Sequence, residues 1–359
     1  MNFIKLCRFF GIDGDVGEIK KLNNGHINAT YKLTVEENGG EQLYIVQRIN
    51  KYVFKDPKVL MKNVTSVTEF IKEKYLSMSV DPDRKVLEFL KSENGESCYY
   101  DDDNYYRCYK FVDRSVTYEL PDSNELLENL GYAIGNFHYM LSDFNTKQLN
   151  ETIPDFHNTE KRLSDLYAAV EKDPFGRAQK AMDDVLKFRK NESEILKLSS
   201  LDLPSRVVHN DPKCNNVLFD EQSNEILALI DLDTVMPGLA AHDFGDAVRS
   251  ACNSCKEDEK DYSLVSLDLD KFKAFTKGYI KKAGNFLSEK EKNSLALGVY
   301  TLACELSARF LTDYILGDVY FTKDYGMHNL VRARSQLAFA EDVYKKLPEM
   351  NRIVSEICM

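Results

Sequence analysis

The sequence predicts a two-lobed α+β protein, with a small β-rich N-terminal lobe at residues 1–112 and a larger, mostly helical C-terminal lobe at residues 113–359. Two observations predict this class. A length of 359 residues exceeds the usual limit of one hydrophobic core, so we expect about two lobes with a ligand cleft between them. The hydrophobic periodicity also changes after residue 113, from short alternating runs to patterns that repeat every three or four residues.

The first lobe is predicted to be a small sheet with one helix. Its first three β-rich runs are at 17–23, 30–36 and 43–49. The turn signals Asn24-Gly25 and ENGG separate these runs. A helix then begins at Asp56 and Pro57, and two more strand candidates follow at 86–91 and 105–112. The resulting β-β-β-α-β-β order resembles a small nucleotide-binding lobe.

The second lobe is predicted to be helical around one short β-hairpin. Helical patterns occur at 125–144, 159–171, 177–198, 239–251, 268–282, 288–316 and 325–346. The hairpin strands are VLFD at 217–220 and ILALIDL at 226–232, joined by EQSNE. There is no internal repeat or low-complexity linker, so the boundary near 112–114 is predicted to be a hinge.

Composition excludes several classes of function. A formal charge of −11 argues against nucleic-acid or anionic-membrane partners, which usually bind clustered Lys and Arg. No apolar run approaches the length needed to span a bilayer, and charges lie inside the short apolar stretch at the start of the sequence. Eight scattered cysteines fit reduced thiols, and the one CxxC pair, Cys252 and Cys255, lacks further zinc ligands. We therefore expect a cytoplasmic protein with no obligate protein partner.

Polar residues with the spacing of a kinase catalytic loop lie beside the hairpin. His209, Asp211 and Asn216 form H-x-D-x-x-x-x-N, and Asp231 ends the second strand. In such a loop the aspartate accepts the proton of the acceptor hydroxyl and the asparagine helps to hold magnesium. Asn216 and Asp231 would then hold Mg²⁺ on the phosphates of ATP, because hard oxygen ligands suit this ion.

Each of these residues also has a purely structural explanation. Asp211 alone could form a turn before Pro212, but an ionised Asp231 after a buried strand needs a partner. The combined spacing favours a functional loop. His209 is expected to brace that loop, while Lys213 either reaches the transferring phosphate or is solvated.

The segment HNDPKCNN followed by IDLDTVMPGLAAHDFGDAVR resembles the aminoglycoside and choline phosphotransferase family of the protein-kinase-like fold. Further motifs from about residue 24 to 320 are similar to those of the bacterial N-acetylhexosamine 1-kinases, namely GHINATY, YIVQRIN and RFLTDYILGDVYF. The resemblance implies ATP and Mg²⁺ as cofactors. It also implies transfer of phosphate to the anomeric hydroxyl of a sugar such as GlcNAc or GalNAc.

The resemblance also assigns roles to individual residues. Asp211 would be the base, Asn216 and Asp231 would be the magnesium ligands, and both aspartates would also contact the sugar. HDFGD at 242–246 spells the protein-kinase metal motif, but it lies too far past the hairpin and is expected at a helix start. Asp243 would instead be a buried brace. Asp233 would either assist the metal or cap the following turn.

Nucleotide-binding residues are predicted at three places. The phosphate-covering loop would contain Asn24, Gly25, His26 and Asn28, although a plain hairpin turn has the same pattern. The third strand, YIVQRIN, lacks the usual lysine. Alternation allows either Gln47 or Arg48 to replace it, and charge favours Arg48, with Glu69 as its acidic partner. Adenine is expected near Phe111 and Asp113.

The resemblance assigns contacts with the sugar to Arg309 and Tyr320. Arg309 could instead neutralise Asp313 at helical i, i+4 spacing. Ala29 stands where the resembling kinases carry an acidic residue, so sugar selectivity is expected to differ. Two alternatives stay open: a kinase of choline, an aminoglycoside or homoserine, and an inactive nucleotide-binding scaffold. The absence of tryptophan disfavours a choline cage, whereas 20 tyrosines leave one possible.

Overall fold

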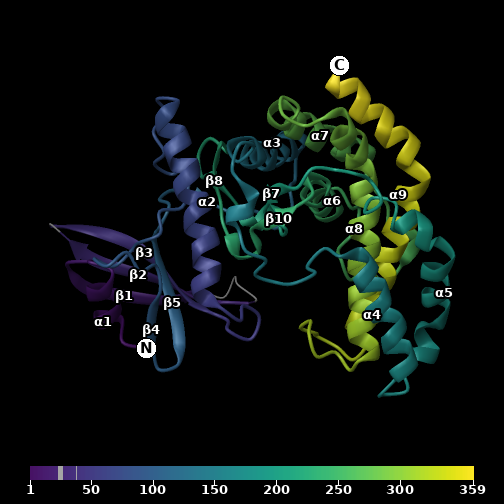
Figure 1. Cartoon of the computed structure of the whole chain (residues 1–359), viewed down its shortest axis with the longest axis horizontal. Coiled ribbons are helices and arrows are strands. Elements are labelled where there is room, and N and C mark those ends of the chain that lie inside the picture. The colour runs from purple at the N-terminus through teal and green to yellow at the C-terminus, as the bar shows by residue number, and fades with distance from the viewer. Residues whose placement is uncertain (23–26, 38) are drawn as a thin grey trace. The chain divides into compact units, whose positions relative to one another are not determined.

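The computed structural model describes residues 1–22, 27–37 and 39–359 (Figure 1). The chain forms two compact units. The first unit comprises Met1–Val116, Asp143–Pro154 and Leu218–Pro237. The second unit comprises Thr117–Ser142, Asp155–Val217 and Gly238–Met359. The predicted lobe boundary at residue 112 stays a prediction.

The first unit is built on an antiparallel sheet with the strand order β1-β2-β3-β5-β4 (Figure 1). The strands are β1 (Asp15–Leu22), β2 (Ala29–Glu37), β3 (Gly40–Ile49), β4 (Tyr99–Asp101) and β5 (Asn104–Lys110). The first three confirm the runs predicted from alternation and turn signals. In the register, Thr30 pairs with Gln47 and Gln47 with Arg107, so these three residues share one face of the sheet.

The two faces of this sheet carry different helices. Helix α1 (Phe3–Phe9), which was not predicted, packs Leu6 and Cys7 against one face, where Leu33 and Val46 are buried. Helix α2 (Pro57–Ser77) lies on the other face, which carries Arg107. The side chain of Asp56 caps its first turn, as the sequence predicts.

The strand predicted at 86–91 is wrong. Within that segment only Phe89 makes a bridge, to Tyr109, and the fourth strand is formed by Tyr99–Asp101. Backbone hydrogen bonds from Leu90 N to Cys108 O and from Lys110 N to Glu88 O join the segment to β5. This pairing is too short to continue as a strand.

The predicted hairpin is confirmed. A small sheet has the order β6-β8-β9, formed by β6 (Ser115–Val116), β8 (Val217–Asp220) and β9 (Ile226–Leu229). The second strand ends at Leu229 rather than at Leu232, because the chain turns at Asp231 into a short 3-10 helix, η3 (Leu232–Thr234). A further 3-10 helix of this unit is η1 (Thr146–Gln148).

The second unit is mostly helical. Its helices are α3 (Asn124–Met140), α4 (Thr159–Lys172), α5 (Ala178–Ile195), α6 (Ala240–Ala251), α7 (Leu269–Ala283), α8 (Glu289–Ile315) and α9 (His328–Cys358). Shorter elements of the chain are β7 (Arg206–Val208), η2 (Cys214–Asn216), β10 (Met236–Gly238) and η4 (Tyr262–Leu264). The predicted helices are confirmed, and α9 runs past the predicted end at 346, through Pro348.

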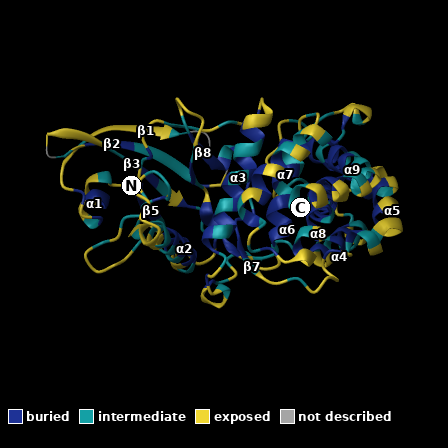
Figure 2. Ribbon diagram, turned by 90° about the horizontal axis from the view of Figure 1, so that it is seen from above, coloured by how far each residue is buried: buried dark blue, intermediate teal, exposed yellow. Residues whose placement is uncertain are grey.

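Buried residues of the second unit gather along α6 and α8 (Figure 2). Helix α8 packs against α4, α6 and α9, and α3 packs against α7. A Cβ atom at Gly245 would lie 2.4 Å from the carbonyl oxygen of Gly298, and one at Gly298 would lie 2.2 Å from that of Ala241. Helices α6 and α8 approach this closely because neither glycine has a side chain. The glycine of HDFGD therefore serves helix packing, and the motif lies at the start of α6, as predicted.

One helix corrects the expectation about apolar runs. Glu289–Ile315 is long and apolar enough to span a membrane, judged by length and composition alone. However, 78% of its apolar window is buried inside the protein, which is typical of a core helix.

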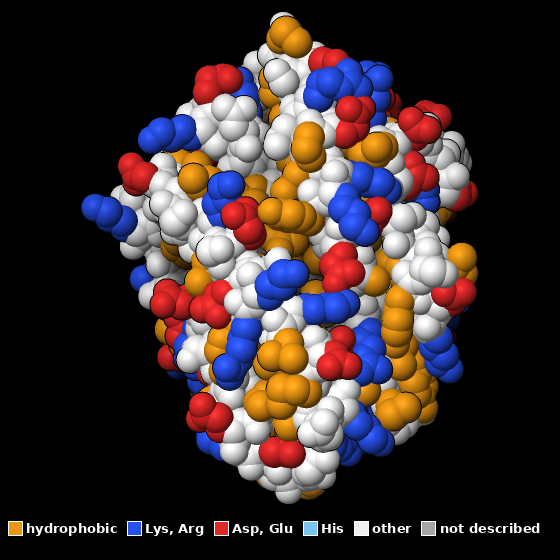
Figure 3. Space-filling view, turned by 90° about the vertical axis from the view of Figure 1, so that its right-hand side faces the viewer, with side chains coloured by type: hydrophobic (Ala, Val, Ile, Leu, Met, Phe, Trp, Pro, Cys, Tyr) orange, Lys and Arg blue, Asp and Glu red, His pale blue; other side chains and the backbone are white. Residues whose placement is uncertain are grey.

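On the molecular face shown in Figure 3, Lys and Arg side chains are interspersed with Asp and Glu side chains.

Candidate active site

The backbone of the loop after β7 is fixed by hydrogen bonds to one buried carboxylate. Asp243, fully buried in α6, accepts hydrogen bonds from the backbone N–H groups of His209 and Asn210, both at 2.7 Å. Asn210 has a φ of +65°, a backbone conformation that is costly for a residue with a side chain. These two charge-assisted bonds offset that cost and fix the backbone immediately before Asp211.

A histidine that the sequence analysis did not single out completes this support. His138 in α3 lies 2.8 Å from Asp243 through Nε2 and 2.9 Å from the Tyr279 hydroxyl through Nδ1. Burial would raise the pKa of Asp243, but the hydrogen bonds from His138 and from the backbone N–H of His209 hold that pKa below its usual range. A lone histidine in an apolar helix gave no sequence signal of this role.

Asp211, Lys213 and Asn216 lie together in this loop. The Lys213 ammonium and the Asn216 amide nitrogen both contact Oδ2 of Asp211, at 2.8 Å and 3.1 Å. Asn216 also donates to the backbone oxygen of Asp211 at 2.8 Å. Oδ1 of Asp211 has no hydrogen-bond partner among the described residues, and the side chain is 31% exposed. The arrangement orients one carboxylate oxygen and leaves the other available to an acceptor hydroxyl.

A second buried pair contacts the same loop from another side. His157 Nδ1 lies 2.8 Å from Oε1 of Glu305, and its Nε2 lies 3.4 Å from the backbone oxygen of Asn210. Thr159 donates to the other oxygen of Glu305 at 3.0 Å. The peptide groups around Asn210 are thus fixed through both N–H and C=O. Neither His157 nor Glu305 was singled out from the sequence.

The Arg309 side chain lies among three aromatic rings in the second unit. Its guanidinium carbon is 5.4 Å from the ring centre of Phe156, 5.9 Å from that of Tyr320 and 5.5 Å from that of Phe321. Phe156 precedes His157, so this group of side chains adjoins the support of the catalytic loop. Within the described part of the chain, Arg309 has no ion-pair partner.

The alternative pairing of Arg309 with Asp313 is not seen. Asp313 is buried and accepts hydrogen bonds from the backbone N–H groups of Val319, Tyr320 and Phe321, at 2.8–3.0 Å. Its role is therefore to shape the loop that carries Tyr320, whose side chain is 60% exposed.

In the first unit, Asp231 and Asp233 lie in a tight turn after β9. Asp231 has a φ of +59° and is exposed. Asp231 is therefore not buried at the end of the strand, and the buried carboxylate of this turn is Asp233, at 3% exposure. The turn is held further by Asn63 in α2, which donates to the backbone oxygen of Val235 at 3.1 Å.

The partner of Asp233 is an arginine that the sequence analysis missed. Arg107 in β5 is 2% exposed and forms an ion pair with Asp233. It also donates to Oε1 of Gln47 at 2.8 Å. Asn28 donates to Asp233 at 2.6 Å, so it lies beside this turn, within the first unit. The only sequence signal was one basic residue within a β-rich run.

This geometry corrects the choice of Arg48. Gln47 shares the face of the sheet that carries Arg107, and strand alternation puts the exposed Arg48 on the other face. The proposed acidic partner is also wrong, because Glu69 forms an ion pair with Lys91.

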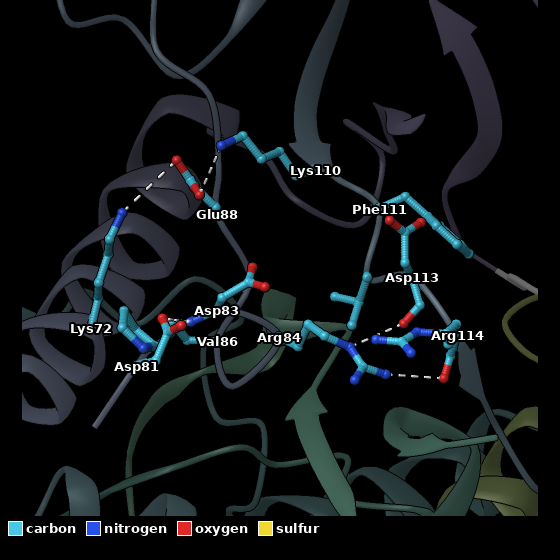
Figure 4. Close-up of a pocket in the computed structure, with 12 residues that line it drawn as sticks. Lys72, Asp81, Asp83, Arg84, Val86, Glu88, Lys110, Phe111, Asp113 and Arg114 are labelled. Atoms are coloured by element: carbon cyan, nitrogen blue, oxygen red, sulfur yellow. Dashed lines mark hydrogen bonds and ion pairs between the residues drawn. The ribbon is translucent and has the colours of Figure 1, made fainter. Parts of the chain in front are cut away.

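The predicted adenine residues line a cavity of about 400 Å³ in the first unit (Figure 4). Phe111 and Asp113 contribute to its wall, and Arg84 donates to the backbone oxygen of Asp113 at 3.1 Å. Glu88 lies between Lys72 and Lys110 in the same cavity (Figure 4). The Lys32 ammonium covers the Phe111 ring at 4.0 Å. Asn24, Gly25 and His26 lie outside the described residues.

The donor types suit magnesium. The amide nitrogen of Asn216 donates hydrogen bonds within its loop, and its amide oxygen is a hard donor, as are the carboxylate oxygens of Asp231 in the first unit. Their role as magnesium ligands stays a prediction. In the part of the chain that the structure describes, no group of three or more His, Cys, Asp or Glu side chains could hold a metal ion. Mg²⁺ needs no such group, because it is commonly bound by one or two carboxylates together with phosphate oxygens.

A family model described as the phosphotransferase enzyme family matches residues 18–261. The chain belongs to this family. The matched segment includes the catalytic loop and the turn at Asp231, whereas Glu305, Arg309 and Tyr320 lie beyond it.

Solved structures of phosphotransferases share the fold. An aminoglycoside phosphotransferase from Alicyclobacillus acidocaldarius matches with a TM-score of 0.63 and 14% identity, over 95% of this chain and 93% of that one. A choline kinase from Cryptosporidium parvum matches with a TM-score of 0.59 and 14% identity, over 99% and 98%. A spectinomycin phosphotransferase in complex with ADP and spectinomycin matches with a TM-score of 0.58 and 13% identity, over 97% of each chain. The predicted α+β, protein-kinase-like fold is confirmed.

Proposed function

We propose that this phosphotransferase uses ATP and Mg²⁺ to phosphorylate the anomeric hydroxyl of N-acetylhexosamines such as GlcNAc and GalNAc, yielding the sugar 1-phosphate. The observation that carries the choice of acceptor is the Arg309 guanidinium, which lies against three aromatic rings and has no ion-pair partner among the described residues. The anomeric position rests on the sequence resemblance.

The proposed chemistry is a single phosphoryl transfer. The acceptor hydroxyl oxygen forms a bond to the γ-phosphorus of ATP, the bond from that phosphorus to the bridging oxygen breaks, and ADP leaves. Oδ1 of Asp211 takes the hydroxyl proton, and Lys213 and Asn216 orient the carboxylate through Oδ2. Asn216 and Asp231 are the proposed ligands of Mg²⁺, which would neutralise charge on the phosphates when bound.

Charge supports a neutral acceptor over a cationic one. Choline, ethanolamine and aminoglycosides are cations, and a positively charged guanidinium among the aromatic rings would repel them. Arg162 is a second guanidinium close to Arg309, because the charge of Arg309, after burial, lowers the pKa of Arg162. The Nε atom of Arg162 is buried without a hydrogen-bond partner among the described residues. Guanidinium donors and an aromatic face instead suit hydroxyl and acetamido oxygens on a sugar ring.

The proposal places the reaction in the cytoplasm. All eight cysteines are free, and Cys252 and Cys255 of the CxxC sequence do not form a disulfide. The only partner that we propose is the small-molecule sugar.

The test is ATP turnover by the purified protein in the presence of Mg²⁺, with GlcNAc, GalNAc, glucose, choline, ethanolamine, homoserine and an aminoglycoside as acceptors. We expect turnover with the two N-acetylhexosamines at a kcat/KM at least about 100-fold above the cationic acceptors. Preference for choline or an aminoglycoside would replace the sugar by that alcohol. Binding of ATP without turnover of any acceptor would favour an inactive scaffold.

A further inference from the structure

The site has an unexplained feature: a buried positive charge on β5, in a sheet whose third strand lacks the expected lysine. Arg107 is 2% exposed, and it pairs with Asp233, which is 3% exposed. Burying two charges is expensive, and a buried pair is often no more stabilising than apolar side chains of similar size. Stability alone is therefore a weak reason for this pair.

Arg107 and its neighbours form a connected network inside the first unit. Arg107 donates to Gln47, and Gln47 donates to the Thr30 hydroxyl at 3.1 Å. Asp233 also accepts from Asn28 at 2.6 Å, and Asn28 in turn accepts from the backbone N–H of Asn50 at 3.0 Å. The network therefore joins the start of β2, the end of β3 and β5 to the turn after β9.

The position of Asp233 decides what this network controls. It lies two residues after Asp231, within the same turn, and Asp231 has the left-handed φ of +59°. Such a conformation persists only where the surrounding structure enforces it. The network anchors this turn through the side chain of Asp233, while Thr152 lies within 3.4 Å of the backbone oxygen of the same residue.

We propose that Arg107 is a positioning residue for the magnesium-binding turn, and that it takes over from the absent strand lysine by acting on Asp233 rather than on the phosphates. This inference rests on the proposed role of Asp231 as a magnesium ligand. In this inference, the uncharged Gln47 occupies the position of the missing lysine. Its side chain orients the guanidinium of Arg107 by accepting a hydrogen bond from it. Asn28, the last residue predicted in the phosphate loop, is anchored to the same turn through Asp233.

The experiment compares Arg107→Met with the double variant Arg107→Met/Asp233→Asn. The single variant leaves a buried carboxylate unpaired and is expected to lose thermal stability, so it serves as the folding reference. The double variant removes both charges and should regain most of the wild-type Tm. Arg48→Met, on the opposite face of the sheet, is the matched control.

The readout is binding of ADP by calorimetry, with and without Mg²⁺, for the full-length protein. We expect the folded double variant to bind Mg·ADP at least roughly tenfold more weakly than the wild type, because mutating residues that orient metal ligands commonly weakens metal binding by this factor. Its affinity for metal-free ADP should stay within about twofold of the wild type, and Arg48→Met should match the wild type in both.

A double variant with wild-type Mg·ADP affinity and a restored Tm would show a merely structural pair and overturn the inference. Equal weakening of metal-free ADP would also overturn it, because the turn would then act on the nucleotide without the metal. A wild type in which Mg²⁺ does not affect ADP binding would overturn the role of Asp231, and with it both the proposed cofactor and this inference. Failure of every sugar in the acceptor panel would instead leave the ADP comparison valid.

Discussion

His157 contacts Glu305 at 2.8 Å through Nδ1 and the backbone oxygen of Asn210 at 3.4 Å through Nε2. A carboxylate and a carbonyl can only accept hydrogen bonds, so both contacts form only when both ring nitrogens carry protons. His138 differs, because the Tyr279 hydroxyl can donate to one of its nitrogens and a neutral ring suffices. The geometry therefore favours His157 as an imidazolium cation.

The charges around His157 agree with this requirement. Burial would lower the pKa of His157, but the charge and hydrogen bond of Glu305 outweigh burial and raise it, with help from Asp246 and opposition from Arg309. Burial would raise the pKa of Glu305, but His157 holds it at about 2. The nearby His242 is kept neutral, since burial and the charge of His157 lower its pKa to about 4.

This pair predicts a pH dependence of stability. A raised folded-state pKa contributes fully below the ordinary value of about 6.5 and is lost as pH rises through the folded value. The lowered pKa of Glu305 contributes above about 4.5 and is lost as pH falls towards 2. Glu305→Gln should therefore cost about 3 kcal/mol in the free energy of unfolding near pH 6, and less at pH 9.

Urea unfolding of the wild type and Glu305→Gln at pH 6 and pH 9 checks this prediction. Exposed Glu171→Gln in α4 is the control and should show no difference at either pH. A cost of Glu305→Gln that is equal at the two pH values would contradict the imidazolium assignment.

Removal of the proposed base or metal ligand should abolish turnover without unfolding the protein. We expect Asp211→Asn and Asp231→Ala each to lower kcat by at least about 1,000-fold, because the first removes the proton acceptor and the second a ligand of the metal. Both side chains are partly or fully exposed, so Tm should change little. Steady-state kinetics of both variants, with the exposed Asp202→Asn as the control, measures this effect. A wild-type kcat in either variant would show that the substituted residue has no catalytic or metal-binding role.

Arg309 should act on the sugar and not on the nucleotide. Arg309→Ala removes the donors that face the aromatic rings, so the KM for the sugar should rise at least tenfold, or about 1.4 kcal/mol, while the KM for ATP stays within about twofold. Arg309→Lys keeps the charge but loses the planar group, and should recover only part of the sugar affinity. Equal effects on both substrates would exclude Arg309 from acceptor binding.

Asp243 should matter for stability and for the catalytic loop together. Asp243→Asn replaces one acceptor oxygen by a donor that faces the N–H groups of His209 and Asn210. Leaving buried donors unsatisfied should lower the free energy of unfolding by about 3 kcal/mol and reduce kcat at 10 °C, where the variant is folded. Urea unfolding against exposed Asp183→Asn measures the cost, and a loss below about 1 kcal/mol would show that the loop is held by other contacts.

Local signals explain what could be predicted from the sequence. Turns and alternation located β1 to β3, the Asp56 cap located the start of α2, and the spacing from His209 to Asn216 located the loop in which Asp211, Lys213 and Asn216 lie together. Each of these features depends on residues that are close together along the chain.

The remaining features depend on contacts between distant residues. Arg107 and Asp233 are 126 positions apart, and His157 and Glu305 are 148 apart, so no local pattern indicates either pair. The choice of Arg48 failed for the same reason. Charge favoured it, whereas the register between β3 and β5 put Gln47 on the face that carries Arg107. The segment at 86–91 has strand composition, but it makes too few backbone hydrogen bonds to β5.

The most direct test of the central claim is phosphorus NMR of the product formed from ATP, Mg²⁺ and N-acetylglucosamine. The account predicts a phosphate resonance coupled to the anomeric proton, which disappears on mild acid treatment and which Asp211→Asn does not produce. A phosphate coupled to the C6 protons, or no sugar phosphate while choline is phosphorylated, would contradict it.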